Sequence, residues 1–370
     1  MGRPNIYILG VGNLGKYVAH ALMKQKAVPN TDIMPITLLL HRDDLVHNWK
    51  RAGCSIRRIA DGVSDIAQGG CLVERVTPNS LAPEIKNLIV ATKAHATVEA
   101  LKPLRRRLSR YSNIIFLQNG MGTIERVNQH VFQNPATRPS YWAGICSAGI
   151  TSSSPPEPFT FVHAGRGPLT VGLVDEDRDT PLPSSDHMIQ RLIGAPELET
   201  QIVSRDEIRR AQVKKLVVNS VINPLTAILG CKNGDLLSTQ AGLDLMDMLL
   251  SEAGPIARAL LIDVLKQDPD VIKRDFSNDA LRDSVHTVAT KTAKNTSSML
   301  QDVRAGRKTE IDYINKYLVS RGAELDLPRA SHASIVRIIS EPDEWLREQR
   351  SPEHWLRHIC LRRDLVRPLL

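Results

Sequence analysis

Glycines near the N-terminus constrain the fold of this chain more than any other feature. They belong to the six-residue turn Gly10-Val11-Gly12-Asn13-Leu14-Gly15. The turn follows the apolar run Ile6–Leu9 and precedes a helical stretch that begins at Tyr17. With this spacing, the first glycine permits a tight turn, the second lets a pyrophosphate approach the backbone, and the third lets the helix pack close to a sheet. A glycine-rich turn without a ligand is the alternative, but the flanking strand and helix favour a dinucleotide site, with the phosphates at the helix N-terminus.

Short apolar runs alternate with helical stretches through the first 150 residues. After Ile6–Leu9 come Ile36–Leu40, Leu88–Ala91 and Ile114–Leu117, each ending at a turn or a polar residue. Runs rich in Ile, Val and Leu are typical of buried parallel strands, and their alternation with helices indicates a doubly wound sheet. Thr160–His163 and Leu169–Gly172 are expected to be two further strands.

The pattern changes from alternating to helical near residue 207 and stays helical to about 338. The predicted fold is therefore α/β, with an N-terminal Rossmann-type dinucleotide-binding domain over 1–206 and an all-helical substrate and catalytic domain over 207–340. The last segment, 341–370, is a separate tail that carries Trp345 and Trp355. We expect the tail to anchor onto the body or onto a second subunit.

Composition excludes several classes of protein. The chain is 42% hydrophobic, as in globular proteins, and the longest apolar runs are too short to span a membrane. A first strand at Ile6 leaves little room for a signal peptide, so a cytoplasmic protein is expected. The net charge of +8 suits phosphate-bearing cofactors and acidic substrates, while only 4% aromatic residues argue against nucleic-acid binding. The five cysteines form no C-x-x-C pair. His354 and His358 are four residues apart and could bind a metal, but no third ligand accompanies them, so a solvated helix face is favoured and no metal is expected.

The end of the second strand indicates which dinucleotide is bound. An acidic residue there would bind the ribose hydroxyls of NADH, whereas an arginine would pair with the 2′-phosphate of NADPH. The chain has Leu40-His41-Arg42, and Asp43 only after the arginine. The sequence thus predicts NADPH, with Arg42 as the phosphate ligand; an exposed surface arginine is the alternative.

Two further loops follow strands at the same predicted edge of the sheet. Lys93 lies in the first, where its side chain is placed to reach the cofactor or the substrate. Asn119 opens the second, which continues through Gly120 and Gly122, and is expected near the nicotinamide. Each loop alone is also compatible with a simple strand-to-helix turn.

A polar stripe marks one helix of the predicted helical domain. Lys215, Asn219 and Asn223 recur at intervals of four residues, so they project from one face of a helix that is otherwise apolar. Buried ammonium and amide groups need partners, and a polar ligand would supply them. The alternative is a stripe that faces solvent or neighbouring helices.

Four segments together resemble the ketopantoate reductase (2-dehydropantoate 2-reductase) family of NADPH-dependent enzymes in pantothenate and coenzyme A synthesis. They are the glycine turn, the loop Asn119–Gly122, the helix Lys215–Leu225, and Ser297–Arg304 running on to Thr309–Asn315. The glycine turn is shared with many dehydrogenases, whereas the last two segments are far more specific. The resemblance covers about residues 5–338.

The resemblance implies a role for each matching position. Lys215 corresponds to the catalytic lysine, the general acid at the ketone oxygen, and Glu310 to a catalytic glutamate that contacts that oxygen or the lysine. Asn119 corresponds to the asparagine that orients nicotinamide, substrate and lysine. Cofactor binding is implied for Lys93 and Arg42 as well as the glycine turn. The implied substrate-binding residues are Lys215, Asn219, Asn223 and Ser298.

The chemistry of ketone reduction agrees with these roles. Hydride addition puts negative charge on the oxygen, and a lysine in a partly desolvated pocket has a lowered pKa that suits a general acid. Thr309 is expected to cap a helix ending near Gly322, with Glu310 in its first turn; alone, Glu310 reads as an acidic helix start. Ser298 alone reads as a helix cap.

The expected function is reduction of ketopantoate to pantoate. The first alternative is reduction of another branched 2-keto acid by the same fold, and the second is a non-catalytic NADP(H)-binding redox sensor. A small-molecule 2-keto acid is the expected partner, with no nucleic acid, no membrane and a possible homodimer.

Overall fold

The computed structural model describes residues 5–25, 35–77, 82–174, 187–265 and 269–341. The tail predicted from the sequence falls outside these residues except for its first one. Within the described ranges, no helix combines the length and the apolar character needed to cross a membrane.

The chain divides into two compact units. The sheet unit comprises Met1–Gln118 and Thr123–Ile208, and the helical unit comprises Asn119–Gly122 and Arg209–Leu370. Helix α6 (Arg205–Leu229) begins in the first unit and continues in the second. The boundary predicted near residue 206 lies in the first turn of this helix.

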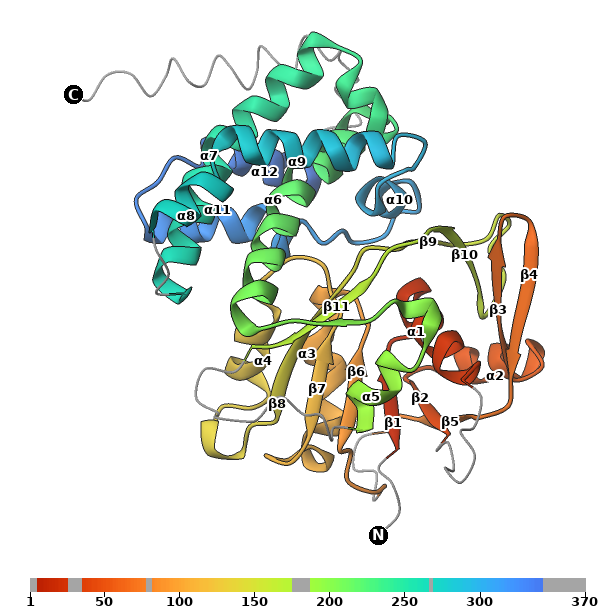
Figure 1. Cartoon of the computed structure of the whole chain (residues 1–370). Helices are drawn as coiled ribbons and strands as arrows, with labels where there is room; N and C mark the ends of the chain where they lie inside the picture. The colour runs from red at the N-terminus through yellow and green to blue at the C-terminus, as the bar shows by residue number, and fades with distance from the viewer. Residues whose placement is uncertain (1–4, 26–34, 78–81, 175–186, 266–268, 342–370) are drawn as a thin grey trace. The chain divides into compact units, whose positions relative to one another are not determined.

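Most strands of the sheet unit belong to one eight-stranded sheet. Its strands are β1 (Ile6–Leu9), β2 (Ile36–Leu40), β5 (Cys71–Arg75), β6 (Asn87–Val90), β7 (Asn113–Phe116), β8 (Ser140–Cys146), β11 (Leu169–Leu173) and β12 (Gln201–Ile202). The order is β12-β11-β8-β7-β6-β1-β2-β5 (Figure 1), and the six strands from β8 to β5 run parallel. The order reverses between β1 and β6, which is where doubly wound sheets bind their ligands. The predicted α/β class is confirmed.

Side chains alternate between the two faces of this sheet and so form two cores. Ile6 and Ile8 of β1 join one buried cluster, whereas Tyr7 and Leu9 join the other. The covering helices are α1 (Asn13–Met23), α2 (Asp43–Arg51), α3 (Thr97–Leu101), α4 (Thr123–His130) and α5 (His187–Ile193). Both faces are thus buried, as the continuous apolar strands require.

A second sheet of four strands was not predicted as such. It has the order β4-β3-β10-β9, from β3 (Ser55–Ala60), β4 (Val63–Gln68), β9 (Gly149–Thr151) and β10 (Thr160–Gly165). Strands β10 and β11 exist as predicted but belong to different sheets. The β3–β4 hairpin turns at Asp61-Gly62, where both residues have positive φ, 50° and 78°. An Asp-Gly pair between strands is the sequence signal of such a hairpin.

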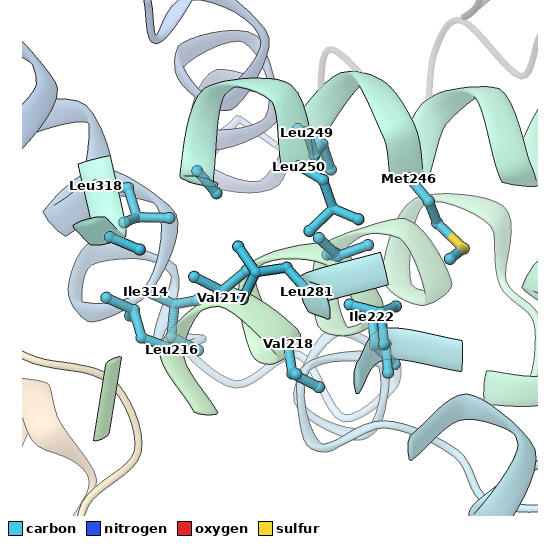
Figure 2. Close-up of a cluster of buried hydrophobic side chains, with 14 of the residues drawn as sticks. Leu216, Val217, Val218, Ile222, Met246, Leu249, Leu250, Leu281, Ile314 and Leu318 are labelled. Carbon is cyan, nitrogen blue, oxygen red and sulfur yellow. The ribbon is translucent and has the colours of Figure 1, made fainter. Parts of the chain in front are cut away.

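The helical unit is built from long apolar helices. They are the C-terminal part of α6, then α7 (Gln240–Leu265), α8 (Pro269–Asp275), α9 (Asn278–Lys291), α10 (Ser298–Arg304), α11 (Asn315–Glu324) and α12 (Ala330–Ser340). One continuous buried cluster joins them, as Figure 2 shows for Leu216 and Ile222 of α6, Leu249 of α7, Leu281 of α9 and Leu318 of α11. Packing of these apolar faces is the main stabilisation of the unit.

Candidate functional site

The glycine turn fits closely against the end of the neighbouring strand. Gly10 has φ +99°, and a Cβ atom there would lie 2.5 Å from the backbone nitrogen of Thr92, just beyond β6. A Cβ atom on Gly15 would lie 1.9 Å from the carbonyl oxygen of Gly10. Both positions therefore require glycine. Gly10 needs it for its positive φ, and at both positions a Cβ atom would overlap backbone atoms.

Gly12 differs from the other two glycines because it borders open space. No atom lies within 4 Å of the position that its Cβ would occupy. Gly12 is also the residue before α1, and no side chain caps this helix end. The N–H groups of the first turn of α1 are thus available to an anion. A cradle of this kind fits the diphosphate of a dinucleotide.

Basic residues gather where β2 and β5 end. Arg42 precedes α2 with its side chain exposed, and its Nε lies 3.4 Å from Oδ1 of Asp44. Arg75, the last residue of β5, donates from Nε to Oδ1 of Asp43 at 2.8 Å. This hydrogen bond from Arg75 holds the pKa of Asp43 below its usual range. The negative charge of Asp43 is therefore already paired with Arg75, which makes this carboxylate a weaker ligand for ribose hydroxyls.

Arg75 is a residue that sequence reasoning missed. Burial and the charges of Arg42 and Arg75 lower the pKa of His41, so the imidazole is the neutral member of this basic edge. Arg75 lies 33 residues after Arg42 in the chain, and only the parallel pairing of Leu40 with Arg75 brings it to the same end of the sheet. No signal in the sequence gave that register.

The loop after β6 carries Lys93 at its turn. Lys93 is half-buried and precedes a short 3-10 helix, and its carbonyl accepts from Oγ1 of Thr97 at 3.2 Å. Oγ1 of Thr97 also lies 2.9 Å from Oγ1 of Thr92, and Nε2 of Gln118 donates to Thr97. These bonds tie the ends of β6 and β7 together at the switch point.

The loop Asn119–Gly122 belongs to the helical unit. The N–H of Met121 donates to the carbonyl of Tyr313 at 2.8 Å. A Cβ atom on Gly120, which has φ +80°, would lie 2.2 Å from the same oxygen. Nδ2 of Asn119 donates to Oε2 of Glu310 at 3.3 Å. Two residues that are 191 positions apart, both predicted to be catalytic, are therefore brought into contact.

The local structure around Glu310 differs from the prediction. Glu310 precedes a three-residue 3-10 helix, Ile311–Tyr313, and α11 begins only at Asn315. The helix ends at Glu324 rather than near Gly322. Ile314, with φ −111° and ψ −87°, interrupts what was predicted as one continuous helix. Such a short helix has a small dipole, which gives little stabilisation to a negative charge on Glu310.

Burial and the Asn119 amide are what define the setting of Glu310. The residue is only 5% exposed, and Thr309 beside it is buried too. Oγ1 of Thr309 accepts a weak hydrogen bond from the N–H of Ile311 at 3.4 Å. Glu310 is thus a carboxylate held inside the helical unit, with an amide donor supplied by the loop after β7.

The polar stripe on α6 has the predicted phase. Lys214 is exposed, Lys215 and Asn219 are half-buried, and Asn223 is buried with 7% exposure. The apolar side chains around the stripe, Leu216, Val217, Val218, Val221 and Ile222, all lie in the core of the helical unit. Within the described residues, no side-chain hydrogen bond is formed by Asn219 or Asn223. These amides are therefore available to a polar ligand or to water.

Ser297, not Ser298, is the cap of α10. Its Oγ accepts from the N–H of Leu300 at 3.1 Å and from Oγ1 of Thr226 on α6 at 2.7 Å. Ser298 is then the first residue of the helix, and its side chain is exposed. The capping alternative therefore belongs to Ser297, and Ser298 is left available as a ligand-binding hydroxyl.

A separate polar cluster in the sheet unit is explained by its own charges. The ligand atoms of His20, Asp65 and Glu197 lie within 4.8 Å of one another. Lys24 donates to Asp65 at 2.8 Å, and Arg58 lies 3.6 Å from Asp65 and 3.4 Å from Glu197. The two cations balance the two carboxylates, so the cluster reads as an ion-pair network that joins α1 to the second sheet.

Comparison with known proteins is consistent across the chain. Residues 6–176 match the family described as ketopantoate reductase PanE/ApbA, and residues 207–343 match its C-terminal part. A probable 2-dehydropantoate 2-reductase of Schizosaccharomyces pombe is 32% identical over 321 residues, which is 85% of this chain and 89% of that protein. A ketoisovalerate reductase of Gibberella fujikuroi is 29% identical, over 90% of this chain and 82% of that protein.

Solved structures agree with the sequence matches. A probable 2-dehydropantoate 2-reductase of Bacillus subtilis has a TM-score of 0.65 at 26% identity, covering 91% of this chain and 99% of that one. A ketopantoate reductase family structure from Ralstonia eutropha has a TM-score of 0.70 at 20% identity, covering 92% and 99%, and supports the fold alone. The chain is thus an oxidoreductase that belongs to the ketopantoate reductase family.

Proposed function

We propose that this protein reduces ketopantoate to pantoate with NADPH, and that Lys215 is the general acid. The polar stripe of α6 carries the proposal. It sets a half-buried ammonium beside two amides that have no side-chain partner among the described residues, on a helix that is otherwise apolar. A 2-keto acid offers carboxylate and ketone oxygens, which are the acceptors that such donors bind.

The residues of the helical unit have separate tasks in this proposal. Lys215 donates a proton from Nζ to the ketone oxygen as negative charge develops there. Asn219, Asn223 and Ser298 bind and orient the keto acid. Glu310, held by the Asn119 amide at 3.3 Å, contacts the reacting oxygen or the lysine. Each task uses a group whose chemistry suits it.

The sheet unit is proposed to hold the cofactor. NADPH supplies the hydride when it is bound. The space beside Gly12 and the uncapped start of α1 suit the diphosphate, and Lys93 lies at the switch point next to it. Arg42 and Arg75 suit a 2′-phosphate, while Asp43 is already engaged by Arg75. This charge arrangement supports NADPH over NADH.

Ketoisovalerate is the second candidate substrate, because a relative of that name matches 90% of this chain. It lacks the side-chain hydroxyl of ketopantoate. The two amides and the serine also carry oxygens that accept hydrogen bonds, and of the two substrates only ketopantoate has a hydroxyl that can donate to them. A site that hydrogen-bonds a substrate hydroxyl discriminates strongly against an analogue without it.

The test is NADPH oxidation by the full-length chain near neutral pH, with ketopantoate, ketoisovalerate and 2-ketobutyrate compared as substrates. We expect kcat/KM for ketopantoate to exceed that for ketoisovalerate by about a hundredfold or more. A reversed order would make the protein a ketoisovalerate reductase. NADPH binding without turnover of any of the three would instead support the redox-sensor alternative. The homodimer and the cytoplasmic location stay predictions.

A further inference from the structure

A gap in the backbone hydrogen bonds of α6 lies at the C-terminal end of the polar stripe. Pro224 has no N–H, so the carbonyl of Ser220, four residues earlier, has no donor from its own helix. Ser220 is fully buried, and an unpaired carbonyl there is costly. The missing bond spans residues 220 to 224 and so encloses Asn223, whereas Lys215 and Asn219 precede it.

Asn315, the first residue of α11, closes this gap. Its Nδ2 donates to the Ser220 carbonyl at 2.8 Å and contacts Nδ1 of His332 at 3.0 Å. The side chain is fully buried, and its Oδ1 has no partner among the described residues. Rotating the amide by half a turn would place Oδ1 against the carbonyl oxygen of Ser220, so the orientation of the amide is fixed. Both amide hydrogens are then used.

His332 is held from both sides of its ring. Because Nδ1 accepts from Asn315, the hydrogen must be on Nε2, which donates to the carbonyl of Leu249 at 3.1 Å. Burial lowers the pKa of His332 against the opposing charge of Glu252, in keeping with a neutral ring. The network therefore reaches from α6 through α11 and α12 to α7.

Glu252 fixes the backbone that carries the imidazole. Its two carboxylate oxygens accept from the N–H groups of Ser331 at 2.9 Å and His332 at 3.1 Å, in the first turn of α12. Glu252 is itself only 4% exposed. A buried carboxylate bound to a helix start is well placed both by hydrogen bonds and by the helix dipole.

We propose that Asn315 is a positioning residue for the keto acid site. With His332 and Glu252, it pairs the Ser220 carbonyl that Pro224 leaves without its helical donor, and so sets Asn223 relative to Lys215 and Asn219. The proposal rests on the proposed function, because it takes the polar stripe as the substrate site. Asn315 acts through the backbone of α6 and not by touching the substrate.

Three variants separate positioning from simple stabilisation. Asn315→Leu keeps the shape but leaves the Ser220 carbonyl unpaired. Pro224→Ala gives that carbonyl an N–H from its own helix and so closes the gap, while Asn315 stays. The double variant has no Asn315 amide, but its carbonyl is paired within the helix. Melting temperature, NADPH affinity, and kcat and KM for the keto acid are measured for all three.

If Asn315 positions the stripe, Asn315→Leu lowers both the melting temperature and, by tenfold or more, kcat/KM. In the double variant the melting temperature recovers, but kcat/KM stays at least tenfold low, and NADPH affinity is unchanged throughout. Wild-type kcat/KM in Pro224→Ala, or joint recovery of stability and activity in the double variant, would overturn the proposal. Should Asn315→Leu not fold, the Pro224→Ala result decides.

A second readout does not depend on turnover. Trinitrobenzenesulfonate labels lysine amines, and mass spectrometry gives the rate for Lys215 relative to its exposed neighbour Lys214. We expect this ratio to change by threefold or more in Asn315→Leu and in Pro224→Ala, and an unchanged ratio in either variant would count against positioning. Absence of turnover in the wild-type protein would defeat the proposed function alone, and the labelling ratio would still decide the role of Asn315.

Discussion

The two proposed ligand sites differ in the side chains that form them. The glycine turn of the sheet unit lacks side chains, whereas α6 of the helical unit carries polar side chains on an apolar helix. Gly12 presents open space and bare N–H groups at the start of α1. Lys215, Asn219 and Asn223 present an ammonium and two amides from an apolar helix. In our proposal, the first site binds the phosphate groups of the cofactor, and the second binds the oxygens of the keto acid.

The two sites also differ in what holds them. A Cβ atom added at Gly10 would lie 2.5 Å from the nearest backbone atom, and one added at Gly15 would lie 1.9 Å from its own nearest backbone atom, so close packing fixes the turn. The stripe depends on buried hydrogen bonds that come from other helices, such as the one from Asn315 at 2.8 Å. Substitutions in the turn should therefore affect folding and cofactor binding, and substitutions near the stripe should affect the keto acid.

The largest expected effect is in the glycine turn. Gly15→Ala puts a Cβ atom against the Gly10 carbonyl and should destabilise the protein by roughly 3 kcal/mol or more, because backbone cannot yield as a side chain does. Urea unfolding measures the loss.

Gly12→Ala is the matched control. Its Cβ meets no protein atom, and its φ of −64° suits any residue, so stability should be unchanged. NADPH affinity should still fall by about tenfold or more, or about 1.4 kcal/mol, because the methyl group fills the phosphate cradle. Unchanged NADPH affinity in a folded Gly12→Ala protein would place the diphosphate elsewhere.

Cofactor choice should change next most, at the basic edge of the sheet unit. Arg42→Ala should weaken NADPH binding by about ten- to a hundredfold, roughly 1.5–3 kcal/mol for a charged hydrogen bond, and leave NADH nearly unaffected. Equal losses for the two cofactors would show that Arg42 does not bind the 2′-phosphate.

Arg75 sharpens the same comparison. Arg75→Ala removes the 2.8 Å bond to Asp43 and frees that carboxylate. We expect the ratio of NADPH to NADH affinity to fall by about tenfold, and Arg75→Ala combined with Asp43→Asn should lose any gain in NADH binding. Fluorescence titration with both cofactors measures these ratios, and a ratio that stays at the wild-type value would assign Arg75 a structural role only.

The smallest expected effect is a difference between the two units in the pH at which their buried charges affect stability. Burial lowers the pKa of His332 from its ordinary value of 6.5, so below that pH the unfolded chain takes up a proton that the folded chain does not. Stability should therefore fall as the pH drops below 6.5, by at most about 1.4 kcal/mol per pH unit. In the sheet unit, Lys24 and His20 help to hold the pKa values of Asp65 and Glu197 low. Their contribution is lost only in more acidic solution, as the pH falls through those lowered values.

His332→Asn isolates this term, because the amide oxygen still accepts from Asn315 but does not titrate. Between pH 7.5 and 5.5, the wild-type free energy of unfolding should fall by about 1 kcal/mol more than that of His332→Asn. His41 and His163, whose pKa values are also lowered by burial, contribute equally to both proteins. Parallel pH profiles would mean that His332 is protonated in the folded protein.

Sequence patterns predicted the parts of both sites that are local in the chain. Strand, glycine turn and helix are adjacent, so the cofactor turn could be read directly, and the i, i+4, i+8 spacing gave the face of α6 that carries Lys215. The contact of Asn119 with Glu310 was not predicted, since the family resemblance implied only a catalytic role for each residue. Contacts between distant segments depend on packing that no local pattern encodes.

Two failures have definite physical causes. Arg75 was missed because its position beside Asp43 follows from the register of β2 with β5. The helix expected from Thr309 to Gly322 is interrupted at Ile314, where the chain turns so that Asn315 can reach the Ser220 carbonyl. The tertiary hydrogen bond to this carbonyl, which Pro224 leaves without its helical donor, overrides the local helical pattern at Ile314, and only the fold reveals it.

The most direct test of this account compares two adjacent lysines by two measurements. Lys215 belongs to the polar stripe, while Lys214 is exposed and about 100° away around the helix. Lys215→Ala should lower ketopantoate turnover by roughly a hundredfold or more, as for loss of a general acid, with NADPH affinity unchanged. Lys214→Ala should leave both quantities near wild type. Two outcomes would contradict the proposal that one unit binds the cofactor and the other carries the chemistry. One is loss of turnover in Lys214→Ala with Lys215→Ala still active, and the other is loss of NADPH binding in Lys215→Ala.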